Sequence, residues 1–427
     1  MIIDKTAISE HNDVLAKEQQ SDFEFIANKL DKKGLDVKNI LQKLVDFQVA
    51  IPSWALGTGG TRFGRFPGGG EPGTLEDKLL DVGLLHALNH SSGAISLHIP
   101  WDIPENVSGI KNLADSLKLK FDAVNSNTFQ DQPDQALSYK FGSLSHADAG
   151  VRQLAIDHNI EVIKYGKELG SKALTVWLAD GSCFPGQNNL RKALKNTLSS
   201  LGTIYDSLPE DWRVLIEYKP FEPNFYSTVI PDWGTSHLLC SKLGKKALSL
   251  VDLGHHLPNT NIEQIVATLM MEGKLGGFHF NDSKFADDDL TVGSIKPYQL
   301  FLIFSELVEG MEDPESINPS IDWMIDASHN LKDPLEDLLQ SVEAIKIAYA
   351  QALIVDRKAL ETAQMSNDVA VAQELMQEAF RTDVRALLAE SRRQVGAAID
   401  PLKLYREAGV RNQLIGERGE LSLATGL

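Results

Sequence analysis

Carboxylate and imidazole side chains gather in this sequence at the ends of short apolar runs. The stretch 276–290 reads GGFHFNDSKFADDDL, and in it His279 is followed by four aspartates, at positions 282, 287, 288 and 289. Carboxylates this close repel one another unless divalent cations lie between them, because a bound cation reverses the repulsion and lowers their pKa values. The D-x-D spacing of Asp287 and Asp289 can point both side chains at one ion from an extended segment. This stretch therefore indicates a metal site.

Other apolar runs end in the same types of residue. They contribute His98, Glu217, Lys219, Asp252, His255 and Asp326. His255 and His256 are adjacent and would point to opposite faces of an extended strand, so at most one of them is expected in the site. The number and the types of these candidate ligands suggest two ions. One mostly oxygen site would use Glu217, Asp252, His279 and Asp326, and a second, with open positions for water or substrate, would use His255, Asp287 and Asp289.

Carboxylate-rich sites with one imidazole suit Mn²⁺, Mg²⁺ or Co²⁺ better than structural Zn²⁺. Each residue alone has a simpler interpretation. A histidine at a strand end is often a hydrogen-bonded structural residue, and an aspartate run in a loop is often a solvated turn or a helix cap. The recurrence of acids and imidazoles at successive strand ends favours the metal centre.

Aromatic residues end the remaining runs. Trp54, Trp101, Phe129 and Trp177 stand at these ends, and Phe63 lies in the glycine-rich loop GTGGTRFGRFPGGGEP. Packing within the core would explain any single ring. Together, an apolar wall opposite metal-binding carboxylates suits a polyol, whose C–H face packs on rings while its hydroxyls bind ions. The glycine loop is a weak candidate for a phosphate site, because it lacks a P-loop lysine and does not lead from a strand into a helix.

The elements that would position these residues alternate along the chain. Eight apolar runs, at 47–54, 94–101, 121–129, 173–180, 212–220, 248–256, 275–282 and 321–330, are separated by amphipathic stretches such as 76–89, 159–170, 261–274 and 298–311. This count predicts an α/β fold of the (β/α)8 TIM barrel type, in which the carboxyl ends of the strands converge on one mouth. An open doubly wound sheet is the alternative, although no GxGxxG follows the first strand.

The barrel is expected to carry helical extensions at both ends. We predict an N-terminal helical extension over residues 1–47, the barrel over 48–345 and a C-terminal helical extension over 346–427, which would supply subunit contacts.

Composition narrows the classes of partner. The chain has 427 residues with 43% hydrophobic and 23% charged residues, as expected of a globular protein, and its net charge of −18 disfavours nucleic acid and anionic membranes. The N-terminus has no apolar signal region and no run of about 18 apolar residues follows, so a cytoplasmic protein is expected. Cys183 and Cys240 are the only cysteines, which excludes a disulfide framework and a cysteine metal site.

The motifs carry a resemblance to a known family. The segments IPSWALGTGGTRF, SLHIPWD, FDAVNSNTF, SKALTVWLADGS, VDLGHHLPNTNIE, GGFHFNDSKFADDDL and MIDASHN resemble the L-rhamnose isomerase family, in its branch of broad-specificity bacterial enzymes. The similarity runs from near the N-terminus to beyond residue 400. It implies a metal-dependent aldose–ketose isomerase on a (β/α)8 barrel with two divalent ions per subunit, Mn²⁺ first and Co²⁺, Mg²⁺ or Zn²⁺ as alternatives. It also implies a homotetramer.

The resemblance further implies roles for individual residues. It gives the same division of metal ligands as above, with sugar contacts from His98 and Lys219 and a pocket lined by Trp54, Phe63, Phe129 and Trp177. The implied reaction converts L-rhamnose to L-rhamnulose by ring opening and a hydride shift between C1 and C2, with D-allose and other hexoses as further substrates. His98 or Asp326 would assist ring opening, and Lys219 would hold O1. The tail GERGELSLATGL departs from the family, which leaves its subunit contacts open.

Three other functions remain to be separated from this one. A sugar epimerase on the same fold would use paired glutamates around one ion, and the second, aspartate-rich site argues against it. A metallohydrolase or repair nuclease could use clustered histidine and aspartate, but the charge of −18 opposes DNA binding. A noncatalytic sugar-binding protein would not need two metal sites with open positions.

Overall fold

A computed structural model of the chain describes residues 3–57, 66–329 and 331–421. Its main sheet has ten strands, all paired in parallel: β1 (Ala50–Pro52), β2 (Ala94–Ser96), β3 (His98–Ile99), β4 (Lys120–Phe121), β5 (Val124–Ser126), β6 (Ala173–Val176), β8 (Arg213–Glu217), β10 (Ala247–Asp252), β11 (Leu275–Phe280) and β12 (Asp322–Ile325). β2 and β3 are separated only by Leu97, and β4 and β5 only by residues 122–123, so the ten strands follow eight paths.

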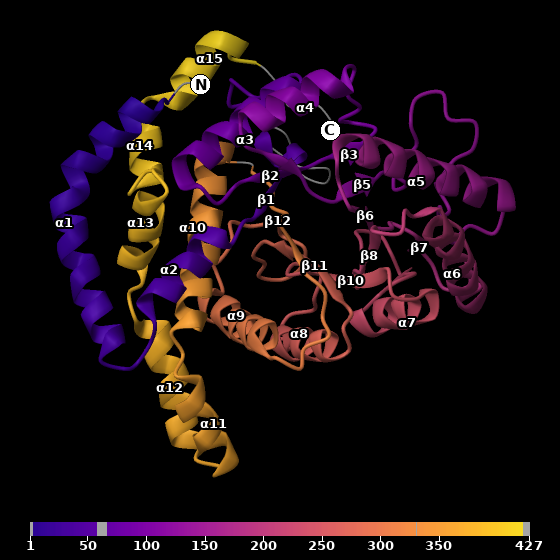
Figure 1. The fold of residues 1–427 in the computed structure, drawn as a ribbon. Coiled ribbons are helices and arrows are strands. Elements are labelled where there is room, and N and C mark those ends of the chain that lie inside the picture. The colour runs from indigo at the N-terminus through magenta and orange to yellow at the C-terminus, as the bar shows by residue number, and fades with distance from the viewer. Residues whose placement is uncertain (1–2, 58–65, 330, 422–427) are drawn as a thin grey trace.

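The sheet closes on itself. β12 pairs with β1 and β1 with β2, while β2 pairs with β4 and β3 with β5, so the two interrupted strands join the ends of the sheet. Figure 1 shows the strands at the centre of a ring of helices. The predicted (β/α)8 barrel with helical extensions is therefore confirmed.

Helices surround the barrel and continue beyond it. They are α1 (Lys5–Asp31), α2 (Val37–Asp46), the 3-10 turn η1 (Ser53–Leu56), α3 (Leu75–Asn89), α4 (Val107–Ser116), α5 (Ala149–Leu169), α6 (Leu190–Ser207), α7 (Trp233–Leu243), α8 (Ile262–Met271), α9 (Pro297–Glu312), α10 (Pro334–Leu353), α11 (Arg357–Met365), α12 (Val369–Arg381), α13 (Arg385–Gln394), α14 (Pro401–Glu407) and α15 (Val410–Arg418). Most begin at a polar cap, as at Thr74, whose hydroxyl accepts a hydrogen bond from the Asp77 N–H. A short antiparallel pair, β7 (Gly181–Ser182) and β9 (Ser227–Thr228), was not predicted.

The inside of the barrel explains why acids collect at its mouth. Alternate residues of a strand share a face, so on β10 Leu248, Leu250 and Asp252 point the same way. The two leucines belong to a small buried cluster with Ala123, Ala173 and Leu215. A Cβ added at Gly277 would lie 3.0 Å from Leu215 Cδ1, so glycine leaves room for this layer. Two residues further along β8, β10 and β11, the same face presents Glu217, Asp252 and His279 at the carboxyl end.

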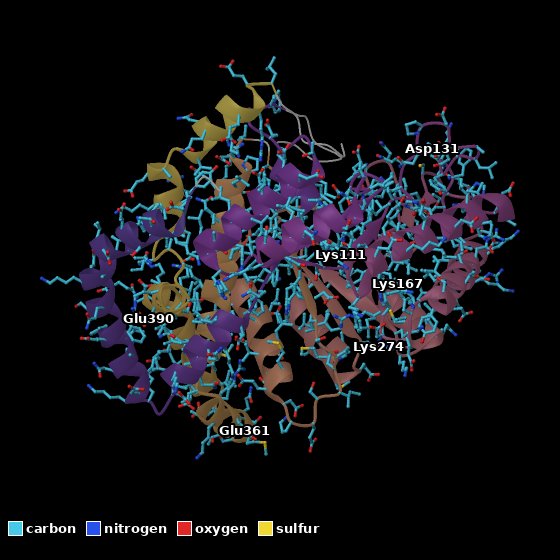
Figure 2. All side chains as sticks on the ribbon, turned by 45° about the horizontal axis from the view of Figure 1, so that its top comes forward. Lys111, Asp131, Lys167, Lys274, Glu361 and Glu390 are labelled. Atoms are coloured by element: carbon cyan, nitrogen blue, oxygen red, sulfur yellow. The ribbon has the colours of Figure 1, made fainter. Side chains whose placement is uncertain are left out.

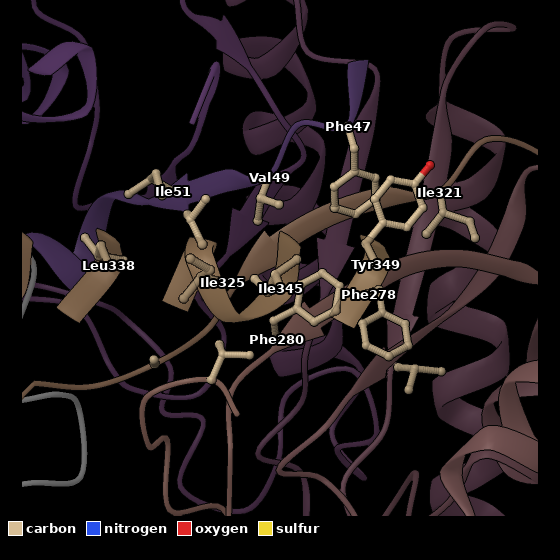
Figure 3. Packing of buried hydrophobic residues seen from close by; sticks show 14 of the residues in the cluster. Phe47, Val49, Ile51, Phe278, Phe280, Ile321, Ile325, Leu338, Ile345 and Tyr349 are labelled. Atoms are coloured by element: carbon tan, nitrogen blue, oxygen red, sulfur yellow. The ribbon is translucent and has the colours of Figure 1, made fainter. Parts of the chain in front are cut away.

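The opposite face of the strands packs on the helices. Phe278 and Phe280 of β11 are fully buried, and Phe280 stacks on Phe304 of α9 with ring centroids 5.5 Å apart. Phe47 stacks on Tyr349 of α10 at 4.5 Å. Figure 3 shows this layer, in which β11 and β12 side chains meet those of α10. Burying these side chains stabilises the fold by roughly 25 cal/mol per Å² of apolar surface. This burial determines which face of each strand points into the barrel.

The two extensions pack on each other at one side of the barrel, where α1 lies along α13 (Figure 1). The Asn12 amide donates to Ala397 O and the Gln19 amide donates to Ala386 O, both at 2.8 Å. The predicted boundary at residue 345 falls inside α10, and the division into three domains stays a prediction.

Many charged side chains lie on the outer surface. Figure 2 shows labelled side chains such as Lys111, Asp131, Lys167 and Glu361 on the helices and loops outside the barrel, and all four are exposed. Within the described residues, no single helix is long and apolar enough to cross a membrane, and only α10 and α11 taken together, bent by 61°, meet that criterion.

The last helix supports the loop that follows β1. Gly70 N–H donates to Gly419 O at 2.9 Å, and Arg418 Nη1 donates to Gly70 O at 3.1 Å. Gly70 has a φ of 76°, and a Cβ there would lie 2.8 Å from Ile415 N, so the turn requires glycine. The C-terminal end of the described chain is thus fastened to a loop at the barrel mouth.

Candidate metal centre

Four side chains from neighbouring strands converge at the carboxyl end of the barrel. Glu217 ends β8, Asp252 ends β10, His279 lies near the end of β11, and Asp326 directly follows β12. His279 Nδ1 lies 3.4 Å from Glu217 Oε1, 3.7 Å from Asp252 Oδ2 and 3.6 Å from Asp326 Oδ2. One ligand atom from each residue lies within 4.8 Å of the others. The structure therefore brings together the four residues predicted for the first site.

These residues fit a divalent cation. Ligand atoms that each lie about 2.0–2.2 Å from one ion are separated by up to about twice that distance, and the measured separations fall in this range. Asp252 Oδ2 and His279 Nδ1 are also buried without a hydrogen-bond partner. A native fold rarely leaves such atoms unsatisfied, and a shared cation would satisfy both.

The shifted pKa values of these residues also favour a bound cation. Burial opposes both charges, yet the pKa of Glu217 is lowered because His279 and His255 lie beside it, and the pKa of His279 is raised because carboxylates surround it. Burial raises the pKa of Asp252, and so do the neighbouring carboxylates, although His255 acts in the opposite direction. The site thus attracts positive charge, which protonated imidazoles supply. A bound cation would take over that role, because a ligating imidazole is neutral.

A second group lies beside the first and shares one residue with it. Asp252, His255 and Asp287 bring ligand atoms within 4.8 Å of one another. The His255 ring lies between the groups, with Nδ1 3.2 Å from Glu217 Oε1 and Nε2 3.4 Å from Asp287 Oδ2. Two of the three residues predicted for the second site are therefore adjacent, and Asp252 joins them.

Asp289 lies outside both groups. Its φ of 48° is in the left-handed region, so the expected extended D-x-D segment does not form at this position. Its Oδ2 accepts a hydrogen bond from Ser328 Oγ at 3.1 Å. Asp288 caps the same loop by accepting bonds from the Lys284 and Phe285 N–H groups. The role of Asp289 as a metal ligand stays a prediction.

Lys219 approaches the second group from the loop after β8. Its Nζ lies 2.6 Å from Asp287 Oδ2 and forms a short ion pair with Glu222. It also lies 5.2 Å from the centre of the Trp177 ring. Sequence analysis did not single out Glu222, although its position three residues after a lysine was a usable signal.

The predicted aromatic residues form a continuous wall. Ring centroids are 5.4 Å apart for Trp54 and His98, 4.3 Å for His98 and Trp101, 5.5 Å for His98 and Phe129, and 4.9 Å for Phe129 and Trp177. The wall meets the first group where Trp54 Nε1 donates to Asp326 Oδ1 at 3.1 Å. Burial lowers the pKa of His98 to about 4, so its imidazole is neutral near pH 7. Phe63 lies outside the described residues.

A buried ion pair that the sequence did not reveal supports this wall. Lys78 of α3 and Asp102 are both buried, with Nζ 2.7 Å from Oδ1. Asp102 Oδ2 also accepts hydrogen bonds from Ser53 Oγ at 2.5 Å and from the His98 N–H at 2.8 Å. This carboxylate therefore holds the backbone turns that carry Trp54 and His98.

Other polar residues of the same segments have structural roles. His256 Nε2 bonds the Tyr218 hydroxyl at 2.7 Å, away from both groups, which agrees with the expectation that only one of the two adjacent histidines enters the site. Asp282 Oδ2 accepts from the N–H groups of Ile295 and Lys296. Asn281 was missed as a supporting residue, and its Nδ2 donates to Asp252 Oδ1 at 2.9 Å.

Two curated proteins of similar sequence are named as probable sugar isomerases. The chain is 52% identical over 398 residues to a probable sugar isomerase of Rhizobium meliloti (strain 1021), with 93% of this chain and 92% of the relative covered. It is 49% identical over 426 residues to a probable sugar isomerase of Mesorhizobium japonicum, with 100% and 98% covered. An L-rhamnose isomerase of Rhodopirellula baltica is 24% identical over 381 residues, with 79% and 86% covered. No model of a protein family matches the sequence.

Solved structures share the fold at low sequence identity. An L-ribulose 3-epimerase aligns with a TM-score of 0.53 at 14% identity, covering 76% of this chain and 98% of the other. A 3-keto-D-glucoside 4-epimerase from E. coli aligns with a TM-score of 0.52 at 12% identity, covering 70% and 99%. At these identities the likeness extends to the barrel architecture alone.

Proposed function

Because the chain belongs to the family of these probable sugar isomerases, we propose that it is a metal-dependent aldose–ketose isomerase that converts L-rhamnose to L-rhamnulose. D-Allose and other hexoses are proposed as further substrates. The distant L-rhamnose isomerase relative supports the choice of sugar. Two Mn²⁺ ions per subunit, a homotetramer and a cytoplasmic location are parts of the same proposal.

One observation carries the proposal most directly. Two candidate cation groups share Asp252 at the carboxyl ends of the strands, and an aromatic wall reaches them through the Trp54–Asp326 hydrogen bond. A sugar needs both kinds of surface, because its hydroxyls bind cations and polar groups while its C–H face packs on rings. This arrangement supports a polyol substrate.

The chain's own residues have separable roles in the proposed reaction. Bound divalent ions would act as Lewis acids on the oxygens at C1 and C2. His98, held neutral by burial, can exchange a proton with the ring oxygen as the sugar opens, and Asp326 is the other candidate for that step. The Lys219 ammonium can donate a hydrogen bond to O1. Trp54 fixes one oxygen of Asp326. Trp177 and Phe129, whose rings are in contact, would shield the reacting carbons from water.

Turnover of aldoses tests the activity itself. Mn²⁺-loaded protein is expected to form a ketose from L-rhamnose, and to form one more slowly from D-allose, when it is incubated with a panel of aldoses and the products are separated by chromatography. Protein stripped of metal is the control. Interconversion of two ketoses, with no aldose consumed, would instead identify a sugar epimerase.

The fate of the C2 hydrogen tests the chemical step. If the predicted ligand carboxylates are all occupied, none of them is free to remove a proton from carbon, so the hydrogen should pass directly from C2 to C1. These carboxylates belong to Glu217, Asp252, Asp287, Asp289 and Asp326. We expect L-rhamnulose formed in D₂O to retain the substrate hydrogen at C1, as read by NMR and mass spectrometry. Stoichiometric deuterium at C1 would show a proton-abstraction route through an enediol, with Asp326 as the first candidate base.

A further inference from the structure

A hydrogen-bonded network centred on the buried residues His329 and Asp337 has no part in the proposed chemistry. His329 and Asp337 are both buried, and His329 Nδ1 forms a short hydrogen bond with Asp337 Oδ2. Asp337 Oδ1 accepts from Lys332 Nζ at 2.8 Å and from the Thr291 hydroxyl. Lys332 Nζ also donates to Thr291 Oγ1 at 2.6 Å. His329, Lys332 and Thr291 together hold the pKa of Asp337 at about 2 despite its burial, so its carboxylate is charged.

This network joins the two loops that carry candidate ligands. Thr291 lies in the loop between β11 and α9, which also contains Asp287 and Asp289. His329 and Lys332 lie in the segment between β12 and α10, which begins with Asp326. The charged Asp337 on the first turn of α10 therefore binds one loop through a threonine hydroxyl and the other through an imidazole and an ammonium.

Further contacts fasten the same two segments. Ser328 N–H donates to Asp289 O at 3.0 Å, and Ser328 Oγ donates to Asp289 Oδ2 at 3.1 Å. At the base of the β11 loop, Asp282 and Leu290 exchange two backbone hydrogen bonds of 2.9 Å. The position of Asp287 relative to Asp326 is thus set by bonds that meet at residues 289–291.

We propose that the His329–Asp337–Thr291 connection is a positioning device that sets the geometry of the second cation group. The inference rests on the proposed function, because it assigns these residues to the metal centre of that isomerase. The three residues are not members of either candidate group, and they act by holding the loop that carries Asp287. Removing a residue that orients a metal ligand typically weakens metal affinity by about 10- to 100-fold.

The test is the affinity of the substrate-free protein for Mn²⁺. Free Mn²⁺ is followed by electron paramagnetic resonance during titration of metal-stripped protein. Thr291→Val keeps the shape of the side chain and removes its hydroxyl. We expect it to raise one of the two Kd values, which we assign to the second group, about tenfold or more while the other stays unchanged. Higher Mn²⁺ should then restore turnover. Thr197→Val, which removes a hydroxyl bonded to Ala193 O on α6, is the matched control and should alter neither Kd.

A second pair of variants keeps the test decisive if one protein is too unstable to purify. His329→Asn retains an amide donor near the position of Nδ1 and should bind both ions nearly as the natural chain does, whereas His329→Ala should weaken the second site. The inference is overturned if Thr291→Val and His329→Ala both keep the second Kd within twofold, or if Thr197→Val weakens it equally. Wild-type protein that binds a single Mn²⁺ would overturn the two-ion function, and the inference with it.

Discussion

Replacing Glu217 with glutamine is expected to lower kcat/KM for aldose isomerisation by about 1,000-fold, equivalent to about 4 kcal/mol of transition-state stabilisation. Glu217 Oε1 is near both His279 Nδ1, at 3.4 Å, and His255 Nδ1, at 3.2 Å, so one substitution removes a negative charge that faces both cation groups. The amide keeps nearly the same volume. The variant should therefore fold, as circular dichroism would show, while losing Mn²⁺ affinity and turnover.

Glu361→Gln is the matched control for this experiment, because Glu361 is an exposed residue of α11 and the charge change is identical. It should leave kcat/KM unchanged. If Glu217→Gln kept activity within tenfold of the natural chain at saturating Mn²⁺, Glu217 could not be a ligand that the reaction depends on, and the first group would need a different assignment.

Exhaustive chelation is expected to abolish activity and lower Tm together. Ions that bind only the folded state stabilise it by mass action, by about 4 kcal/mol per site when free ion is about 1,000 times its Kd. For a chain of this size that change lowers Tm by several degrees. Relief of the repulsion that Asp252 and Asp326 feel from neighbouring carboxylates is part of this binding free energy. Thermal unfolding with EDTA, and again after Mn²⁺ is restored, measures the effect.

The Glu217→Gln protein connects the two experiments. If stabilisation by metal arises at this centre, EDTA should lower the Tm of the variant less than that of the natural chain. Full activity after chelation, with metal content verified as absent, would contradict a metal-dependent reaction. An equal fall in Tm for both proteins would place the stabilising ion elsewhere.

Much of the fold followed from residue patterns that depend on local geometry. The alternation in β10, with Leu248, Leu250 and Asp252 on one face, is visible in the sequence because strands repeat every two residues. The breaks at Leu97 and at residues 122–123 were not visible, because a strand interrupted for one or two residues keeps its apolar character. The short β7–β9 pair was also missed, since two-residue strands have no periodicity to detect.

The candidate site was predictable to the extent that strand ends determine it. Glu217, Asp252, His279 and Asp326 come together because parallel strands of a barrel end at the same mouth. The positions of loop residues were harder to predict. Asp289 takes a left-handed backbone conformation, which its spacing along the chain could not reveal. The sharing of Asp252 between the groups depends on the turn that brings His255 back toward Glu217, and periodicity carries no information about such turns.

The contact between α15 and the glycine turn at residues 69–70 bears on how relatives of this protein can be recombined. Gly70 is hydrogen-bonded to Gly419 and Arg418 and has no room for a side chain beside Ile415. The sequence of the turn and the sequence of the last helix must therefore be compatible with each other. A chimaera that joins the barrel of one relative to the final helices of another would bring together surfaces that were never selected to fit. The unit that can be exchanged intact between relatives is therefore the chain from the β1 loop to α15. A crossover placed after the eighth strand would disturb the loop at the mouth of the barrel.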